Sequence, residues 1–173
     1  MKEILIVDGY NIINSWRDVF DLEKSTMAEA RVRLLDILSD YQGYSGHRIV
    51  VVFDAHMVKE GLGSLDIHDN IKVVFTRENQ TADNFIERFV KNYGAGKTIR
   101  VATGDYMEQK TVLTKGGLRM TPNELKSEIF TQIKEHKKHA SGKVDRDFLE
   151  SRLTGEQKSI FESIRRNRTE YTP

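Results

Sequence analysis

The chain has 173 residues, of which 31% are charged and 38% hydrophobic, and its formal net charge is +1. This size and composition predict one soluble globular domain with a core of its own. The sequence has no cysteine, which excludes disulfides, thiolate catalysis and cysteine-ligated metals and agrees with a cytoplasmic location. We expect no membrane partner, because no apolar run approaches the roughly 20 residues of a membrane span. The short apolar run at the N-terminus ends in a carboxylate, so no secretion signal is expected either.

Continuous apolar runs predict four buried strands, at residues 4–7, 49–53, 71–75 and 99–102. A polar loop is expected after the second strand. Capping residues and helical periodicity predict helices at residues 25–42 and 81–93, at Asp105 onward and from Thr121 onward. Residues 136–143 have the composition of an exposed linker, and residues 145–166 the apolar spacing of a last helix. The alternation of strands and helices predicts a mainly parallel sheet covered on both faces.

Acidic residues stand where the predicted elements begin or end. Asp8, Asp54 and Asp105 follow strands, and Asp83 lies at the start of a helix. Because the carboxyl ends of parallel strands share one edge, these carboxylates are expected to converge where α/β sheets place their active sites. Carboxylates without histidine or cysteine suit Mg²⁺ or a similar hard cation, which in proteins commonly serves chemistry at phosphate. Asn11 lies close enough to orient a ligand.

Each of these acids also has a structural interpretation. Asp83 would be stabilised by the helix macrodipole, and Glu87, one turn later on the same face, reaches either the same cation or solvent. Asp105 and Glu108 have the spacing of a capping box. The Thr103 hydroxyl is a further candidate to contact a carboxylate, water or phosphate.

Positive charge is concentrated in the second half of the chain. Residues 109–143 hold eight basic and three acidic residues, an excess of five positive charges. Within them Lys115, Arg119 and Lys126 are candidates to bind a polyanion, such as a nucleic-acid backbone, beside the acidic centre, although a solvated helix face would have the same composition. Aromatic side chains that could stack on bases, or pack in the core, are Tyr10, Trp16, Tyr41, Tyr44 and Tyr106.

These motifs, taken in order, resemble the YacP-like NYN-domain family of the PIN-like nuclease superfamily. The resemblance rests on Val-Asp-Gly-Tyr-Asn at 7–11, Val-Phe-Asp-Ala-His at 52–56, Gln-Thr-Ala-Asp at 80–83, Ala-Thr-Gly-Asp-Tyr-x-x-Gln at 102–109 and Gly-Gly-Leu-Arg-Met-Thr-Pro-x-Glu-Leu at 116–125. It covers nearly the whole chain. The chain departs from the family pattern at Gly104, where serine is frequent.

The resemblance implies a PIN-like three-layer α/β/α sandwich over residues 1–173, with a basic helical extension from about residue 136. It implies an Mg²⁺- or Mn²⁺-dependent endoribonuclease that cleaves single-stranded RNA, in particular mRNA in association with the ribosome. Asp8, Asp83 and Asp105 would hold the metal, and Asn11 and Asp54 would line the same pocket.

Two other functions fit parts of the pattern. A phosphoacceptor receiver domain would also place an acid after its first strand, an acceptor at Asp54 and a threonine at Thr103, although no lysine follows a clear fifth strand. A non-catalytic RNA- or ribosome-binding module would keep the fold without the reaction.

Overall fold

The computed structural model describes residues 3–54, 62–77, 80–94 and 96–141, with side chains on the last helix as far as His136. The chain divides into two compact units, Met1–Lys134 and Glu135–Pro173. The sheet and nearly all described helices belong to the first unit. The helix expected at 145–166 lies outside the described residues, and the single-domain organisation stays a prediction. None of the described helices combines the length and the apolar character that crossing a bilayer requires.

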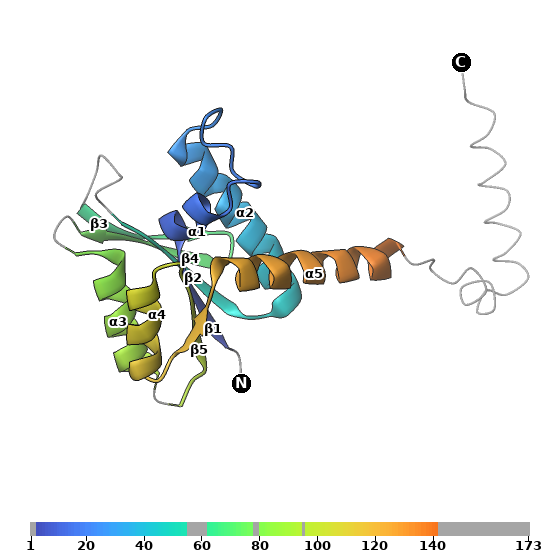
Figure 1. Cartoon of the computed structure of the whole chain (residues 1–173). Helices are drawn as coiled ribbons and strands as arrows, with labels where there is room; N and C mark the ends of the chain where they lie inside the picture. The colour runs from blue at the N-terminus through green and yellow to red at the C-terminus, as the bar shows by residue number, and fades with distance from the viewer. Residues whose placement is uncertain (1–2, 55–61, 78–79, 95, 142–173) are drawn as a thin grey trace, which may run out of the picture. The chain divides into compact units, whose positions relative to one another are not determined.

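One six-stranded sheet forms the centre of the first unit (Figure 1). Its strands lie in the order β3-β4-β2-β1-β5-β6, and only β3 is antiparallel to its neighbour. The strands are β1 (Ile4–Asp8), β2 (Arg48–Phe53), β3 (Leu62–His68), β4 (Ile71–Arg77), β5 (Ile99–Ala102) and β6 (Leu118–Met120). The predicted mainly parallel sheet is therefore confirmed.

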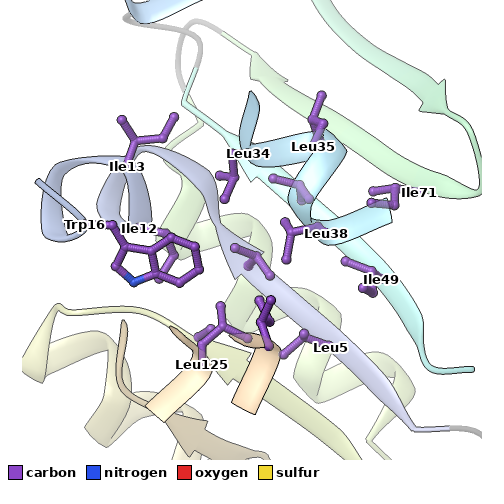
Figure 2. Close-up of a cluster of buried hydrophobic side chains, with 14 of the residues drawn as sticks. Leu5, Ile12, Ile13, Trp16, Leu34, Leu35, Leu38, Ile49, Ile71 and Leu125 are labelled. Atoms are coloured by element: carbon purple, nitrogen blue, oxygen red, sulfur yellow. The ribbon is translucent and has the colours of Figure 1, made fainter. Parts of the chain in front are cut away.

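In the described residues, five helices cover the two faces of this sheet. They are α1 (Gly9–Ser15), α2 (Met27–Ser45), α3 (Ala82–Tyr93), α4 (Tyr106–Thr114) and α5 (Pro122–Ser141). Side chains on β1 alternate between two cores: Leu5 packs with α1, α2 and α5, and Ile6 packs with α3 and α4. Figure 2 shows the first core, in which Leu38 of α2 lies beside Ile49 of β2. The three-layer sandwich is confirmed, and it explains why the parallel strands read as unbroken apolar runs.

Two helices begin with the capping boxes that the sequence predicts. At the start of α2 the Glu29 amide donates to the Thr26 hydroxyl at 3.2 Å, and the Thr26 amide donates to the Glu29 carboxylate at 2.7 Å. The Thr121 and Glu124 pair at the start of α5 makes the same two bonds, at 3.2 and 2.7 Å. These reciprocal bonds satisfy amides that no helical carbonyl reaches, so they fix where the two helices begin.

The structure differs from the expected elements in four places. Strand β3 occupies part of the expected polar loop, because its pairing with β4 at the sheet edge stabilises an extended conformation there. The short strand β6 follows the Gly116-Gly117 turn. Helix α1 begins directly after Asp8, where the sequence predicted no helix. The linker expected at 136–143 is helical as far as Ser141, since α5 continues to that residue.

A partly buried ionic network lies away from the carboxyl ends of the strands. Arg100, near the start of β5, contacts Glu3 at 2.9 Å and Glu128 of α5 at 2.7 Å. The Tyr41 hydroxyl donates to the same Glu128 carboxylate. The network therefore ties the start of β1 to β5, α2 and α5.

Candidate active site

Asp8 is the last residue of β1 and the N-cap of α1. Its Oδ1 accepts a hydrogen bond from the Asn11 amide at 3.3 Å, and only 8% of the residue is exposed. The next residue has to be glycine, because a Cβ at Gly9 would lie 2.2 Å from the Phe53 ring. This close contact lets α1 pack directly over the end of β2, and it holds the Asp8 carboxylate at the carboxyl edge of the sheet.

Two further carboxylates reach Asp8 from helices on one face of the sheet. Asp83 lies in the first turn of α3, whose N-cap Thr81 accepts the Asn84 amide at 3.3 Å. Glu108 lies in the first turn of α4 and is buried on the same face as Val112. One carboxylate oxygen from each of Asp8, Asp83 and Glu108 lies within 4.8 Å of the others. Asp83 is exposed, so the cluster is open to solvent on its side.

Burial and mutual repulsion weaken the acidity of this trio. Burial raises the pKa of Asp8 to about 6, with further increases from Asp83, Asp54 and Asp105 and a decrease from the Asn11 amide. Burial likewise raises the pKa of Glu108 to about 8, and the charges of its acidic neighbours add to the shift. The pKa of Asp83 is raised by partial desolvation of its carboxylate, although the residue as a whole is exposed, and then by the charges of Asp105 and Asp54. Every charged neighbour in these shifts is an acid, so the trio favours protons or a cation.

Glu108 is the member of the trio with the least support from the protein. Within the described part of the chain, neither of its carboxylate oxygens accepts a hydrogen bond. The Thr103 hydroxyl is near enough to lower the pKa of Glu108, although it does not make a hydrogen bond of good geometry to it. A buried carboxylate without hydrogen bonds is costly, and it is stable in that place when a proton or a metal ion binds to it.

The sequence expectation placed Asp105, instead of Glu108, among the metal ligands. In the structure Asp105 is the N-cap of α4, and its Oδ1 accepts the amides of Met107 at 2.7 Å and Glu108 at 3.1 Å. Thr103 supports this turn, because its hydroxyl accepts the Asp105 amide at 3.1 Å. Asp105 lies near enough for its charge to raise the pKa of Asp8, Asp83 and Glu108. Its part in binding a metal stays a prediction.

Asn11 and Asp54 also lie at this edge of the sheet. The Asn11 Oδ1 accepts the Gly104 amide at 2.6 Å, which joins the start of α1 to the loop before α4. Asp54 follows β2, and its charge raises the pKa of both Asp8 and Asp83. Five acids therefore surround this point, and Asn11 connects helix α1, which follows Asp8, to the loop that carries Asp105.

The remaining predicted residues lie in ion pairs outside the trio. Lys115, at the C-terminal end of α4, contacts Glu87 at 3.1 Å, so Glu87 points to a lysine and not to the trio. Arg119, on β6, contacts Glu124 at 3.5 Å. Lys126, on α5, contacts Asp18. Their contact with RNA stays a prediction.

Glu108 is the site residue that the sequence did not single out. Its spacing from Asp105 indicated a capping box, but its side chain turns inward and Asp105 alone supplies the cap. A usable indication was available: Glu108 and Val112 are four residues apart, and Val112 belongs to the apolar face of α4. An acid on the buried face of a short helix suggests a functional role.

The donor set fits a divalent cation. Two oxygens on opposite sides of a Mg²⁺ ion lie about 4.2 Å apart, twice the metal–oxygen distance of about 2.1 Å. The spacing within the trio is of the same size, at no more than 4.8 Å. Oxygen ligands from carboxylates are those that Mg²⁺ and Mn²⁺ prefer. Asp8, Asp83 and Glu108 are therefore the described residues best placed to hold such an ion.

The fold and the site define a nuclease-like α/β domain with an acidic centre at the carboxyl edge of its sheet. The parallel strands, numbered among themselves, lie in the order 3-2-1-4-5. A receiver domain has the order 2-1-3-4-5, so that alternative does not fit. The chain belongs to the YacP-like NYN-domain family, whose model matches residues 5–166.

Comparison with known proteins supports the same conclusion. The chain is 43% identical over 130 residues to the Bacillus subtilis (strain 168) protein named "Uncharacterized protein YacP", covering 75% of this chain and 76% of the relative. The crystal structure of Rae1 (YacP) from Bacillus subtilis is similar with a TM-score of 0.69 and 35% identity over 99% of each chain. The crystal structure of a mutant of that protein gives a TM-score of 0.70 at 35% identity, over 83% of this chain and 86% of the other.

Proposed function

We propose that this protein is an Mg²⁺- or Mn²⁺-dependent endoribonuclease that cleaves single-stranded RNA. The observation that carries the proposal is the trio of Asp8, Asp83 and Glu108, with carboxylate oxygens within 4.8 Å of one another, in a chain of the NYN family. The resemblance to that family supports mRNA as the substrate and the ribosome as a partner. A cytoplasmic location agrees with such a substrate.

The residues of the trio would hold the cation between β1, α3 and α4. When bound, the cation would neutralise charge on the scissile phosphate and lower the pKa of an attacking water. Asp8 and Glu108, whose pKa values are raised to about 6 and about 8, would release their protons as the cation binds. Asp54 and Asp105 add negative charge around the trio and so strengthen its attraction for the cation.

The test is cleavage of an end-labelled single-stranded RNA with Mg²⁺ or Mn²⁺ and with EDTA. We expect the wild-type chain to cut within the RNA only when the metal is present. Asp8→Asn keeps the size of the side chain and an oxygen that can accept the Asn11 amide, but it removes a charged ligand. It should abolish cleavage while the protein stays folded.

Asp36→Asn is a matched control, because Asp36 lies on the exposed side of α2 and contacts His68 instead of the trio. Cleavage by Asp8→Asn at the wild-type rate would contradict the assignment. Tight RNA binding by the wild-type chain without any cleavage would instead favour a non-catalytic RNA-binding module.

A further inference from the structure

The sequence indicates five aromatic side chains that could stack on bases. In the structure, one of the five is both exposed and close to the acidic trio. Tyr10, Trp16 and Tyr41 are buried, with 7%, 0% and 0% exposed, so they belong to the core. Tyr44 is 41% exposed but lies in the last turn of α2, just before β2 begins, which is the opposite edge of the sheet from the acidic trio. Tyr106 is 75% exposed, the highest value among the large hydrophobic residues that the structure describes.

Tyr106 lies at the rim of the acidic site. It is the first residue of α4, it follows Asp105 directly, and it precedes Glu108 of the trio by two residues. The backbone beneath it is held in place, because Asp105 caps the helix through the amides of Met107 and Glu108. Met107 beside it is 67% exposed. Two large apolar side chains therefore face solvent within one turn of a buried carboxylate.

The core does not account for this exposure. Tyr106 and Met107 belong to neither buried cluster, and within the described part of the chain the Tyr106 ring contacts no other aromatic ring and no cation. An aromatic ring on a fixed helix start needs little ordering when a planar ligand stacks on it. Base–aromatic stacking accepts any nucleobase, because every base has a π-face.

We infer that Tyr106 is a stacking platform for an unpaired base next to the phosphate that occupies the acidic centre. The inference rests on the proposed function for the identity of the polymer, a single-stranded nucleic acid. A base inside a duplex is already stacked on both faces, so this platform selects strands whose bases are free. Tyr106 thereby adds a binding subsite for the base beside the acidic centre.

The test compares two 12-residue single-stranded RNA probes: one with all its bases and one abasic, with the same number of phosphates. Binding is measured by fluorescence anisotropy in Ca²⁺, which also neutralises carboxylates, and the integrity of each probe is checked on a gel. The wild-type chain should prefer the probe with bases. Tyr106→Ala should bind that probe about 5- to 150-fold more weakly, the range that loss of one base–aromatic stack produces. It should bind the abasic probe as the wild type does.

Two further variants make the result specific. Tyr106→Phe keeps the ring and should keep the preference for bases. Tyr93→Ala is the matched control, since Tyr93 is 51% exposed but ends α3 at the opposite edge of the sheet. A Tyr106→Ala variant that binds both probes as the wild type does would overturn the inference, and so would a wild-type chain that does not distinguish the probes or binds neither.

Metal-dependent cleavage is scored separately. Cleavage without a Tyr106 effect contradicts only the stacking platform. A Tyr106 effect on binding without cleavage contradicts only the nuclease.

Discussion

The side-chain oxygen of Asn11 accepts a hydrogen bond from the Gly104 amide at 2.6 Å, across 93 residues of sequence. The bond connects helix α1, which follows Asp8, to the loop that carries Asp105 and leads to Glu108. A Cβ at position 104 would lie 2.6 Å from that same Asn11 oxygen. The glycine and the asparagine are therefore matched: a larger residue at 104 has to displace the Asn11 side chain and break the bond.

This relationship predicts a coupled pair of substitutions. Asn11→Ala should cost about 1 kcal/mol in unfolding free energy, a usual value for one hydrogen bond. Gly104→Ala should cost a similar amount, because its methyl group expels the Asn11 side chain. The double variant should be less destabilised than the sum of the two, since the bond can be lost only once. Chemical denaturation of the four proteins gives the coupling energy. Additive costs would show that Gly104 and Asn11 act independently.

A second prediction concerns the ligand set of the metal. Glu108→Gln should weaken Mn²⁺ binding by at least tenfold. Substitutions of residues that only hydrogen-bond to a metal ligand already lower metal affinity by roughly 10- to 100-fold. Asp105→Asn should weaken it less, because asparagine caps a helix as well as aspartate does and the trio stays intact. Isothermal titration of Mn²⁺ into each variant makes the comparison. An equal or larger loss in Asp105→Asn would place Asp105 among the ligands, as the sequence alone predicted.

The raised pKa values predict how the metal-free protein responds to pH. A carboxyl whose pKa is higher in the folded state keeps its proton up to a higher pH in that state. The stability that it contributes is therefore present at low pH and is lost as pH rises. For Asp8 the loss begins near 3.8 and is complete above about 6, and it amounts to about 3 kcal/mol. Glu108 extends the decline to about pH 8.

Melting temperatures in EDTA between pH 4 and 8 check this prediction. They should fall as pH rises, and Mn²⁺ should restore stability most strongly at high pH. Asp8→Asn and Glu108→Gln should each flatten the profile, which separates the trio from other titrating groups. A metal-free protein that gains stability over this range, with no difference in the two variants, would contradict the assigned shifts.

The structure sharpens the prediction about RNA contacts. Arg119 lies one residue from the carboxyl end of β6, whereas Lys115 lies at the far end of α4 from Asp105. Both side chains contact a glutamate, so they are matched in that respect. Arg119→Ala should reduce the salt dependence of RNA binding by about 0.7 in log–log slope, the contribution of one phosphate contact on a single strand. Lys115→Ala should change it less. RNA affinities of both variants, measured from 50 to 300 mM salt, give the two slopes. A larger change in Lys115→Ala than in Arg119→Ala would indicate that the RNA binds along the other edge of the sheet.

Much of the sheet could be predicted because the parallel strands are covered on both faces. Burial on both sides makes every position apolar, so β1 and β2 stand out as unbroken runs that end at Asp8 and Asp54. Strand β3 could not be found in this way. It is an edge strand with Leu65 and Ile67 exposed, and it owes its conformation to pairing with β4. Tertiary pairing of this kind leaves little trace in local sequence.

The candidate site shows the same limit. Asp8 and Asp83 could be predicted because the end of a strand and the start of a helix are marked locally by glycine and threonine. Glu108 was missed, because α4 also carries exposed apolar residues such as Met107 and Leu113, so the spacing of Glu108 and Val112 alone does not decide which face of α4 is buried. That depends on α3 and the sheet, which the chain supplies from distant segments. Residues whose role arises from packing are those that local patterns miss.

The central position of β1 has a consequence for the newly made chain. β1 is synthesised first, yet it lies between β2 and β5, and the Arg100 network that fastens its first residues is complete only with Glu128. The trio is likewise incomplete until Glu108 has been synthesised, a hundred residues after Asp8. A chain that is still short of these positions has an unpaired strand edge and lacks one carboxylate of the trio. The fold therefore closes late, as expected when its contacts join distant parts of the sequence.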